Sequence, residues 1–350
     1  MTDISLIDKN FAVDKEIDKT GLRFYDAEEA PFEIYGVFRE GDCFRRMPEA
    51  VAATVSDGVR KLHTKNAGGR VRFATDSARI AVRAKLHAIG KMPHFALTGS
   101  AGFDLYADGR YVKSFIPPFT IEGGFESVIE LETAERREIT INFPLYSGVN
   151  YLEIGLAEEA EIWEPKPYRP LKPIVYYGSS ITQGGCASRP GRSYQSAIER
   201  RLNCDYINLG FSGKAKGEPE MANYIKDLPM SVFVYDYDHN AHRSENLLET
   251  HEPFFRTVRE ANPDLPIVMM NRPKFYLTEA EKERRAIIET TYQNALKAGD
   301  KNVYFISNEE LCALCADEGT VDGCHPTDYG FASMAQAVGD VLEKILNGLS

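Results

Sequence analysis

The segment Asp322 to His325, DGCH, places a carboxylate three residues before a histidine. Far upstream, the segment Gly178 to Ile181, GSSI, follows an apolar run. A serine hydroxyl becomes a good nucleophile only when a histidine takes its proton, and that histidine needs a carboxylate to fix its tautomer and to stabilise the imidazolium that forms. Ser180, His325 and Asp322 are therefore a candidate hydrolytic triad, with Ser180 at the carboxyl end of a predicted β-strand.

Two further polar segments follow predicted strands. NLGFSG ends at Gly213, and DYDHN ends at Asn240. A hydrolase must stabilise the negative oxygen of a tetrahedral intermediate, and a glycine N–H together with an asparagine amide can do so. Taken singly, each residue is more often a turn glycine or a loop amide. Their joint occurrence at successive strand ends favours an oxyanion hole. His239 and His242 lie beside Asn240, but neither has a carboxylate at the Asp-x-x-His spacing, so we expect His239 in the pocket wall.

The first half of the chain predicts an antiparallel β-structure. Short runs of alternating apolar and polar residues extend from about residue 32 to residue 162, and Ala107-Asp108-Gly109 is a strong hairpin signal. We therefore expect a β-sandwich of jelly-roll type. A stretch with four prolines at 165, 167, 170 and 173 can neither pair in a sheet nor continue a helix. We therefore place the predicted domain boundary in this stretch, which gives domains of residues 1–165 and 166–350.

The second half alternates strands and helices, which predicts a doubly wound parallel α/β sheet. Thr278 and Glu281 form a capping-box pattern ahead of a long charged helix, and Thr327 is a candidate cap for the last helix. The expected strands are residues 174–177, 206–209, 232–237, 267–270 and 303–306.

Net charge, apolar content and cysteine spacing limit the partners and the location that we expect for the protein. The chain has 350 residues and a formal net charge of −11, which makes nucleic acid and anionic membranes unsuitable partners. No apolar run is long enough to cross a bilayer, and no export signal is visible. The six cysteines are scattered, which favours reduced thiols and a cytoplasmic location. Cys312 and Cys315 have the spacing of half a zinc site, but with no second pair we expect packing and no metal.

These motifs resemble a known family. GSSI, Gly213, Asn240 and Asp322-x-x-His325 are similar in order and spacing to the four blocks of the SGNH or GDSL hydrolase superfamily. Gly102 to Tyr106, GFDLY, also matches the GxDLY signature of an N-terminal β-domain fused to one branch of it. The resemblance implies a flavodoxin-like catalytic sheet, the Ser180, His325 and Asp322 triad, and no metal or organic cofactor. It implies an oxyanion hole made by the Ser180 N–H, the Gly213 N–H and the Asn240 side chain.

One position departs from the family pattern. The usual first block is Gly-Asp-Ser-Leu or Gly-Asp-Ser-Ile, and here Ser179 replaces the aspartate. Aligning the glycine and the isoleucine makes Ser180 the nucleophile and leaves Ser179 as a neighbour that could contact substrate. The Gly-x-Ser-x-Gly motif of the α/β-hydrolase fold is absent.

Other residues are candidates for substrate binding. The glycine-rich segment 182–192 is expected to be a long exposed loop over the nucleophile. Arg189 and Arg192 in it could bind a substrate oxygen or could pin the loop to acidic residues, and the sequence does not decide between the two. Phe211 and Tyr237 lie near strand ends and could line a sugar-sized cleft.

The resemblance to carbohydrate esterases predicts an enzyme that removes small acyl groups, acetyl above all, from a carbohydrate. The alternatives are a lipase or thioesterase for longer chains, which the polar loop disfavours, and a non-catalytic glycan-binding protein on an SGNH fold. A small acylated carbohydrate is the expected partner, and a homo-oligomer is compatible with the family and an unpaired sandwich face. Whether the N-terminal domain reaches the active site is left open.

Overall fold

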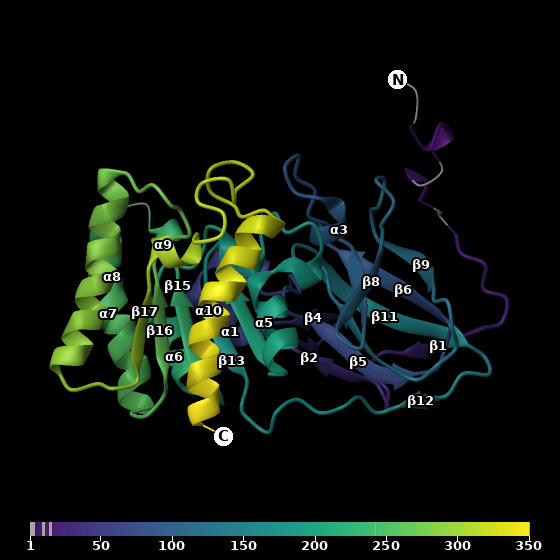
Figure 1. Ribbon diagram of the computed structural model, residues 1–350, viewed down its shortest axis with the longest axis horizontal. Coiled ribbons are helices and arrows are strands. Elements are labelled where there is room, and N and C mark those ends of the chain that lie inside the picture. Colours follow the sequence, from purple (N-terminus) through teal and green to yellow (C-terminus); the bar gives the residue numbers. More distant parts are fainter. Residues whose placement is uncertain (1–3, 9–10, 14–15, 242, 350) are drawn as a thin grey trace.

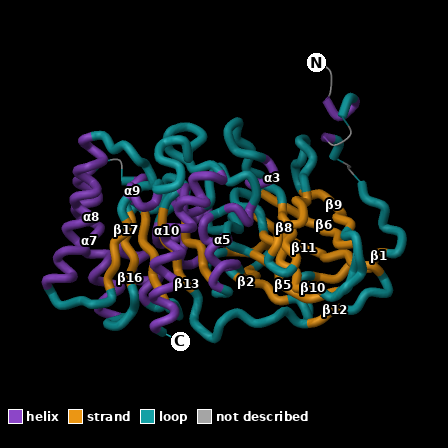
Figure 2. Tube along the Cα trace, in the orientation of Figure 1, coloured by secondary structure: helices purple, strands orange, loops and turns teal. Residues whose placement is uncertain are grey.

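The protein was analysed as a computed structural model that describes residues 4–8, 11–13, 16–241 and 243–349. Antiparallel strands gather at one end of the long axis, and a parallel sheet covered by helices lies at the other (Figures 1 and 2). In the described part of the chain, no helix is both long and apolar enough to cross a membrane. Each of the six cysteines is a free thiol, and Cys312 and Cys315 are buried.

The N-terminal half forms two facing antiparallel sheets. One has the order β1-β11-β6-β9, and the other has the order β12-β5-β10-β7-β8, with β2 beside β5. Apolar side chains from both sheets share one core, so the predicted β-sandwich is confirmed, while its jelly-roll type stays a prediction. The strands are β1 (Leu22–Asp26), β2 (Glu33–Tyr35), β5 (Arg70–Thr75), β6 (Arg79–His87), β7 (Phe103–Ala107), β8 (Arg110–Phe115), β9 (Gly124–Glu130), β10 (Arg137–Asn142), β11 (Gly148–Ala157) and β12 (Ile162–Trp163).

The hairpin signal is confirmed. Strands β7 and β8 pair through Ala107 and Arg110, so Asp108 and Gly109 form a two-residue turn. Both turn residues have positive φ angles, 49° and 74°, as the turn that suits the twist of a hairpin requires. Strand β7 carries the GxDLY signature, and all five of its residues are buried.

The C-terminal half forms a five-stranded parallel sheet in the order β14-β13-β15-β16-β17. This order reverses direction beside β13, and ligands of doubly wound sheets bind at such a switch point. The strands are β13 (Ile174–Gly178), β14 (Tyr206–Gly210), β15 (Val232–Asp236), β16 (Ile267–Met270) and β17 (Val303–Ile306). The five predicted strands are confirmed to within one residue at each end.

Helices cover both faces of this sheet. One face packs on α5 (Tyr194–Leu202) and α10 (Asp328–Gly348), and the other packs on α6 (Pro219–Lys226), α7 (Ser244–Ala261) and α8 (Glu279–Lys297). The capping box of α8 is confirmed, since the Thr278 N–H donates to the Glu281 carboxylate at 2.8 Å. Thr327 occupies the cap position of α10, but its hydroxyl donates to Gly319 O instead of capping the helix. Two short helices, α4 (Ser180–Gln183) and α9 (Asn308–Leu311), complete this half.

Part of the N-terminal half packs on the parallel sheet. The hairpin of β3 (Phe38–Glu40) and β4 (Cys43–Arg45) leads into α1 (Glu49–Val55) and α2 (Asp57–Leu62), and α3 (Leu97–Ser100) precedes β7. Ala52 of α1 and Val59 of α2 belong to the core of the face that α6 and α7 cover. The N-terminal half therefore forms the β-sandwich and also contributes side chains to the core beside the parallel sheet.

Candidate active site

The candidate nucleophile lies where β13 ends and α4 begins. Ser179 is the N-cap of α4, and its hydroxyl accepts a hydrogen bond from the Ile181 N–H at 3.2 Å. Ser180 is the first residue of the helix, with 7% of its surface exposed. Gly178 is required here, because a β-carbon at this position would lie 2.0 Å from the Asp236 carbonyl oxygen of the neighbouring strand. The tight packing of two strands thus fixes where Ser180 emerges.

Ser180, His325 and Asp322 form a continuous chain of hydrogen bonds. The Ser180 Oγ lies 3.0 Å from His325 Nε2, and His325 Nδ1 lies 2.8 Å from Asp322 Oδ2. The second carboxylate oxygen, Oδ1, accepts from the backbone N–H groups of Cys324 and His325 at 3.0 and 2.7 Å. The structure therefore brings the three predicted triad residues together in the order that a serine hydrolase uses.

The environment of Asp322 keeps it ionised. Partial burial raises the pKa of its carboxyl group, but hydrogen bonds from the His325 ring and from two backbone N–H groups outweigh burial and lower the pKa to about 2. A carboxylate that accepts several N–H bonds is expected to behave in this way. Asp322 can therefore hold His325 in the tautomer that leaves Nε2 free to accept a proton from Ser180.

The three candidate oxyanion donors follow the carboxyl ends of the adjacent strands β13, β14 and β15. The Ser180 N–H starts a helix and the Gly213 N–H lies in a turn with φ of 67°, and neither donates to another backbone group of the described residues. Asn240 Nδ2 donates to Phe211 O at 3.1 Å, which uses one of its two amide hydrogens. These three groups are the candidates for an oxyanion hole.

The β-sandwich supplies two residues to this site. Tyr146, which precedes β11, donates its hydroxyl to the Ser180 carbonyl oxygen at 3.1 Å. His94, from the loop before α3, places Nε2 3.7 Å from Asp322 Oδ2, with its ring centroid 5.9 Å from that of His325. The loop before α3 and the loop before α10 lie along one edge of the molecule (Figure 1). No sequence signal identified these residues, because both belong to loops of the other half of the chain.

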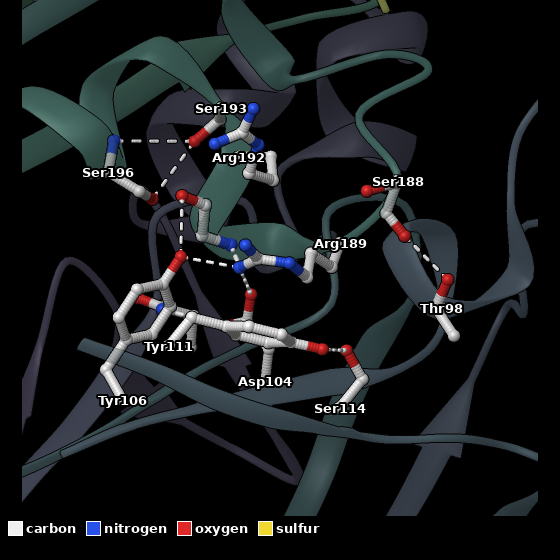
Figure 3. Close-up of polar contacts among 12 residues, drawn as sticks. Thr98, Asp104, Tyr106, Tyr111, Ser114, Ser188, Arg189, Arg192, Ser193 and Ser196 are labelled. Atoms are coloured by element: carbon white, nitrogen blue, oxygen red, sulfur yellow. Dashed lines mark hydrogen bonds and ion pairs between the residues drawn. The ribbon is translucent and has the colours of Figure 1, made fainter. Parts of the chain in front are cut away.

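The GxDLY signature is a docking element for the loop that follows the nucleophile. Asp104 is fully buried, and its Oδ2 accepts from the Gly191 N–H at 2.8 Å and from Arg189 Nη1 at 3.1 Å. Tyr106 accepts from the same arginine at 2.5 Å and donates to Gly191 O at 3.2 Å. Arg189 also lies over the ring of Tyr111, 3.5 Å from its centroid (Figure 3). Asp104 and Tyr106 of the signature thus bind the loop after Ser180 to the β-sandwich.

The same loop is tied to the segment that carries His325. Ser188 donates its N–H and its hydroxyl to the two carboxylate oxygens of Asp328, at 2.8 and 2.5 Å. Arg192 also pairs with Asp328, at 3.3 Å, and Thr98 of α3 donates to Ser188 O at 2.6 Å. Since Asp328 begins α10 three residues after His325, one network connects the β-sandwich, the loop after Ser180 and the segment that carries His325.

Several expectations for substrate binding need correction. Segment 182–192 is mostly buried rather than exposed, because the β-sandwich covers it. Arg189 and Arg192 pair with Asp104 and Asp328, so they pin the loop. Phe211 and Tyr237 are core residues with 0% and 2% of their surfaces exposed, and neither can line an open cleft. Ser179 is fully buried as a helix cap and is not positioned to contact substrate.

His239 lies beside the triad. It is half-buried, and its Nδ1 lies 3.6 Å from the thiol of Cys324, the residue before His325. Its Nε2 has no hydrogen-bond partner among the residues that the structure describes, and burial lowers the pKa of the ring well below its ordinary value. A neutral ring at this place agrees with a role in the site wall. His242 lies outside the described residues.

We expect Asp104→Asn to destabilise the protein. Burial raises the pKa of Asp104, and the Asn142 amide and the Arg189 guanidinium oppose that rise. Replacing one partner of a buried pair leaves the other charge without its counterion, which costs about 3 kcal/mol. Urea unfolding would measure the loss. Arg192→Gln, which breaks a half-exposed pair in the same loop, should cost less than about 1 kcal/mol. Equal stability of Asp104→Asn and the unchanged protein would contradict a structural role for the signature.

Comparisons with known proteins identify relatives of both halves of the chain. A sequence model of the GDSL-like lipase/acylhydrolase family matches residues 171–343, and one of the N-terminal domain of SGNH-type esterases matches residues 22–162. A solved structure from Bacteroides ovatus, described as a GDSL-like lipase, is 31% identical, covers 93% of this chain and 98% of its own, and superposes with a TM-score of 0.84. The chain belongs to the GDSL-like lipase/acylhydrolase family. It is an ester hydrolase with an SGNH-type core.

More distant structures share the fold over the whole chain. A salicylyl-acyltransferase from a tetracycline biosynthetic pathway is 19% identical, with 94% of this chain and 98% of that chain covered and a TM-score of 0.73. An acetyl xylan esterase from Butyrivibrio proteoclasticus is 11% identical, with 93% and 99% covered and a TM-score of 0.60. No curated protein matches the chain in sequence. The two-part architecture of this chain is thus also found in an acyltransferase and in an acetyl xylan esterase.

Proposed function

We propose that the protein is a serine esterase that removes small acyl groups, acetyl above all, from a carbohydrate. The observation that carries the proposal is the unbroken chain of hydrogen bonds from Ser180 through His325 to Asp322. Each group has the neighbour that its role requires. The non-catalytic alternative is disfavoured, because a decayed site would have no reason to keep all these contacts.

The mechanism is a double displacement. His325 Nε2 takes the proton of Ser180 Oγ as the serine attacks the ester carbonyl carbon, and Asp322 stabilises the imidazolium. The N–H groups of Ser180 and Gly213 and the amide of Asn240 stabilise the oxyanion. His325 then protonates the leaving alcohol oxygen, which yields an acyl-enzyme. Water, deprotonated by His325, attacks the acyl carbonyl and releases the carboxylic acid and Ser180.

Polar groups near the triad support a short acyl chain in the proposal. The groups that flank Ser180 are small or polar: the Ser212 N–H donates to the Gln183 side chain, and the Tyr146 hydroxyl donates to the serine carbonyl. His325 and Asp322 retain 25% and 34% exposure of their side chains, so the alcohol portion of a substrate can remain outside. These features favour a small acyl group on a polar, solvated alcohol such as a sugar.

The carbohydrate part of the proposal comes from architecture. The acetyl xylan esterase from Butyrivibrio proteoclasticus and the family two carbohydrate esterase from Cellvibrio japonicus share the fold over more than nine-tenths of this chain. Their identities of 11% and 13% show the fold alone, so the substrate class needs a direct test.

Chain-length selectivity gives the first test. Rates of p-nitrophenol release from acetate, butyrate and octanoate esters should fall as the acyl chain lengthens, and acetate release from acetylated xylan or mannan oligosaccharides should follow. Octanoate hydrolysed faster than acetate would favour the lipase alternative. Rapid p-nitrophenyl acetate hydrolysis without acetate release from any acetylated sugar would contradict the carbohydrate substrate and leave the small-acyl esterase.

Removing the Asn240 amide tests the oxyanion hole. Asn240→Ala should lower kcat by about 10²- to 10³-fold with a small change in KM, because the lost hydrogen bond forms mainly in the transition state. Asn262→Ala is a suitable control, since this asparagine lies at the C-terminal end of α7, where its side-chain amide donates to the backbone carbonyls of Lys226 and Val258. Equal kcat values for Asn240→Ala and Asn262→Ala would remove Asn240 from the proposed mechanism.

A further inference from the structure

Two imidazoles and a thiol converge beside the triad. His94 comes from the β-sandwich, Cys186 from the loop after the nucleophile, and His325 from the segment before α10. Each of the three offers one ligand atom, and the three atoms lie within 4.8 Å of one another. The mechanism proposed above uses neither His94 nor Cys186, so their position needs another explanation.

The donor set identifies the class of ion. Imidazole nitrogen and thiolate sulfur are the ligands that zinc prefers, whereas magnesium and calcium prefer oxygen. Tetrahedral zinc with bonds of about 2.0–2.3 Å holds its ligand atoms roughly 3.5 Å apart, so the three side chains need only small movements to reach it. Three protein ligands leave a fourth position for water. We propose that His94, Cys186 and His325 form a zinc site that switches the esterase off.

Binding at this site must disable the triad. His325 Nε2 lies within hydrogen-bond distance of the Ser180 Oγ, at 3.0 Å. His325 Nδ1 lies within hydrogen-bond distance of Asp322 Oδ2, at 2.8 Å. Both ring nitrogens are therefore occupied by catalytic contacts. A zinc ion on Nε2 removes the base, and a zinc ion on Nδ1 breaks the bond that orients it. The inhibitory effect rests on the proposed triad, whereas binding of the ion does not.

The site is accessible to solvent. The His94 side chain is 42% exposed, and Cys186 is partly exposed. Cys186 has a φ of 75°, a left-handed conformation that residues with a β-carbon rarely adopt. The metal must displace the Cys186 thiol proton to solvent when it binds. Zinc is acidic enough to do so at neutral pH.

A second thiol and imidazole pair provides the matched control. Cys324 Sγ lies 3.6 Å from His239 Nδ1, and Cys324 adjoins His325 in sequence. If zinc bound without preference to cysteines near the active site, it could bind Cys324 and His239 instead. Cys324→Ser removes that thiol and leaves His94 and Cys186 unchanged, so it separates the proposed site from its neighbour.

Inhibition is measured after the full-length protein has been freed of metals with a chelator. Hydrolysis of p-nitrophenyl acetate is titrated with zinc, with magnesium as the hard-metal comparison and each variant's metal-free rate as its own reference. We expect micromolar zinc, but not magnesium, to inhibit the unchanged protein and Cys324→Ser. Cys186→Ser and His94→Gln should each require at least about 10- to 100-fold more zinc for half inhibition. Equal sensitivity of Cys186→Ser and the unchanged protein, or loss of inhibition in Cys324→Ser alone, would overturn the assignment.

Binding is measured separately by calorimetry on the Ser180→Ala protein, which retains all three ligands and does not depend on activity. One zinc ion per chain is expected, and adding the Cys186→Ser change should abolish or greatly weaken the binding. No zinc binding at micromolar concentration would refute the site even if the esterase itself is confirmed. Conversely, an inactive unchanged protein that still binds zinc through Cys186 would refute the proposed function and keep the metal site.

Discussion

Replacing Ser180 by alanine is expected to lower kcat for p-nitrophenyl acetate by roughly 10⁴- to 10⁶-fold, which leaves only slow hydrolysis assisted by the oxyanion donors. The reason is direct: the Ser180 hydroxyl is the group bonded to His325 Nε2, at 3.0 Å. Substrate binding should be nearly unchanged, because the lost atom is a nucleophile and not a binding group. Steady-state kinetics with the purified variant would measure the effect.

Ser179→Ala is the matched control, since the two serines are adjacent and the change is the same. Ser179 caps α4, so its loss should cost about 1 kcal/mol of stability and reduce activity only modestly. Thermal unfolding and kinetics would separate the two effects. An inactive but folded Ser179→Ala protein, together with an active Ser180→Ala protein, would show that the nucleophile has been misassigned.

Asp322→Asn should have the second largest effect, a fall in kcat of about 10⁴-fold. An asparagine can hold His325 in the wrong tautomer and cannot stabilise the imidazolium. Asp317→Asn makes the same change at an exposed position nearby and should leave kcat unaltered. If Asp322→Asn retained most of the activity, His325 would have to be oriented by another group, and the triad would reduce to a Ser180 and His325 pair.

The pKa of Asp322 adds a dependence of stability on pH. Because its folded-state pKa is lowered to about 2 from an ordinary value near 3.8, the ionised carboxylate stabilises the fold above about pH 4. That contribution is lost as the pH falls from about 4 to about 2. The difference in unfolding free energy between the unchanged protein and Asp322→Asn should therefore shrink over this interval, as urea unfolding at several pH values would measure.

Much of the catalytic half could be predicted from sequence because its signals are local. A buried parallel strand is a short apolar run, and a polar residue directly after it lies at the carboxyl edge of the sheet. Ser180, Gly213 and Asn240 each follow such a run, and the structure places all three at that edge. The Asp-x-x-His spacing is likewise a local feature, since Asp322 bonds to both the ring and the backbone of His325.

Contacts between the two halves could not be predicted, because they join residues far apart in the chain. Segment 182–192 contains many glycines and polar residues, which ordinarily indicate an exposed loop. It is buried here because Asp104 and Tyr106 satisfy its polar groups from the other half. For the same reason, nothing in the sequence placed His94 beside Asp322. Phe211 lies at a strand end as expected, but the Arg46 side chain from the N-terminal half covers its ring and buries it.

The most direct test of the account is to identify the residue that carries the acyl group. The protein is treated with a phosphonate ester that reacts only with activated serines, and intact mass and peptide mass spectra locate the adduct. We predict a single adduct, on Ser180. The Ser180→Ala protein should form no adduct, and the Asp322→Asn protein should form it more slowly than the unchanged protein. An adduct on Ser179, or no adduct in a protein that still hydrolyses esters, would contradict the proposed catalytic serine.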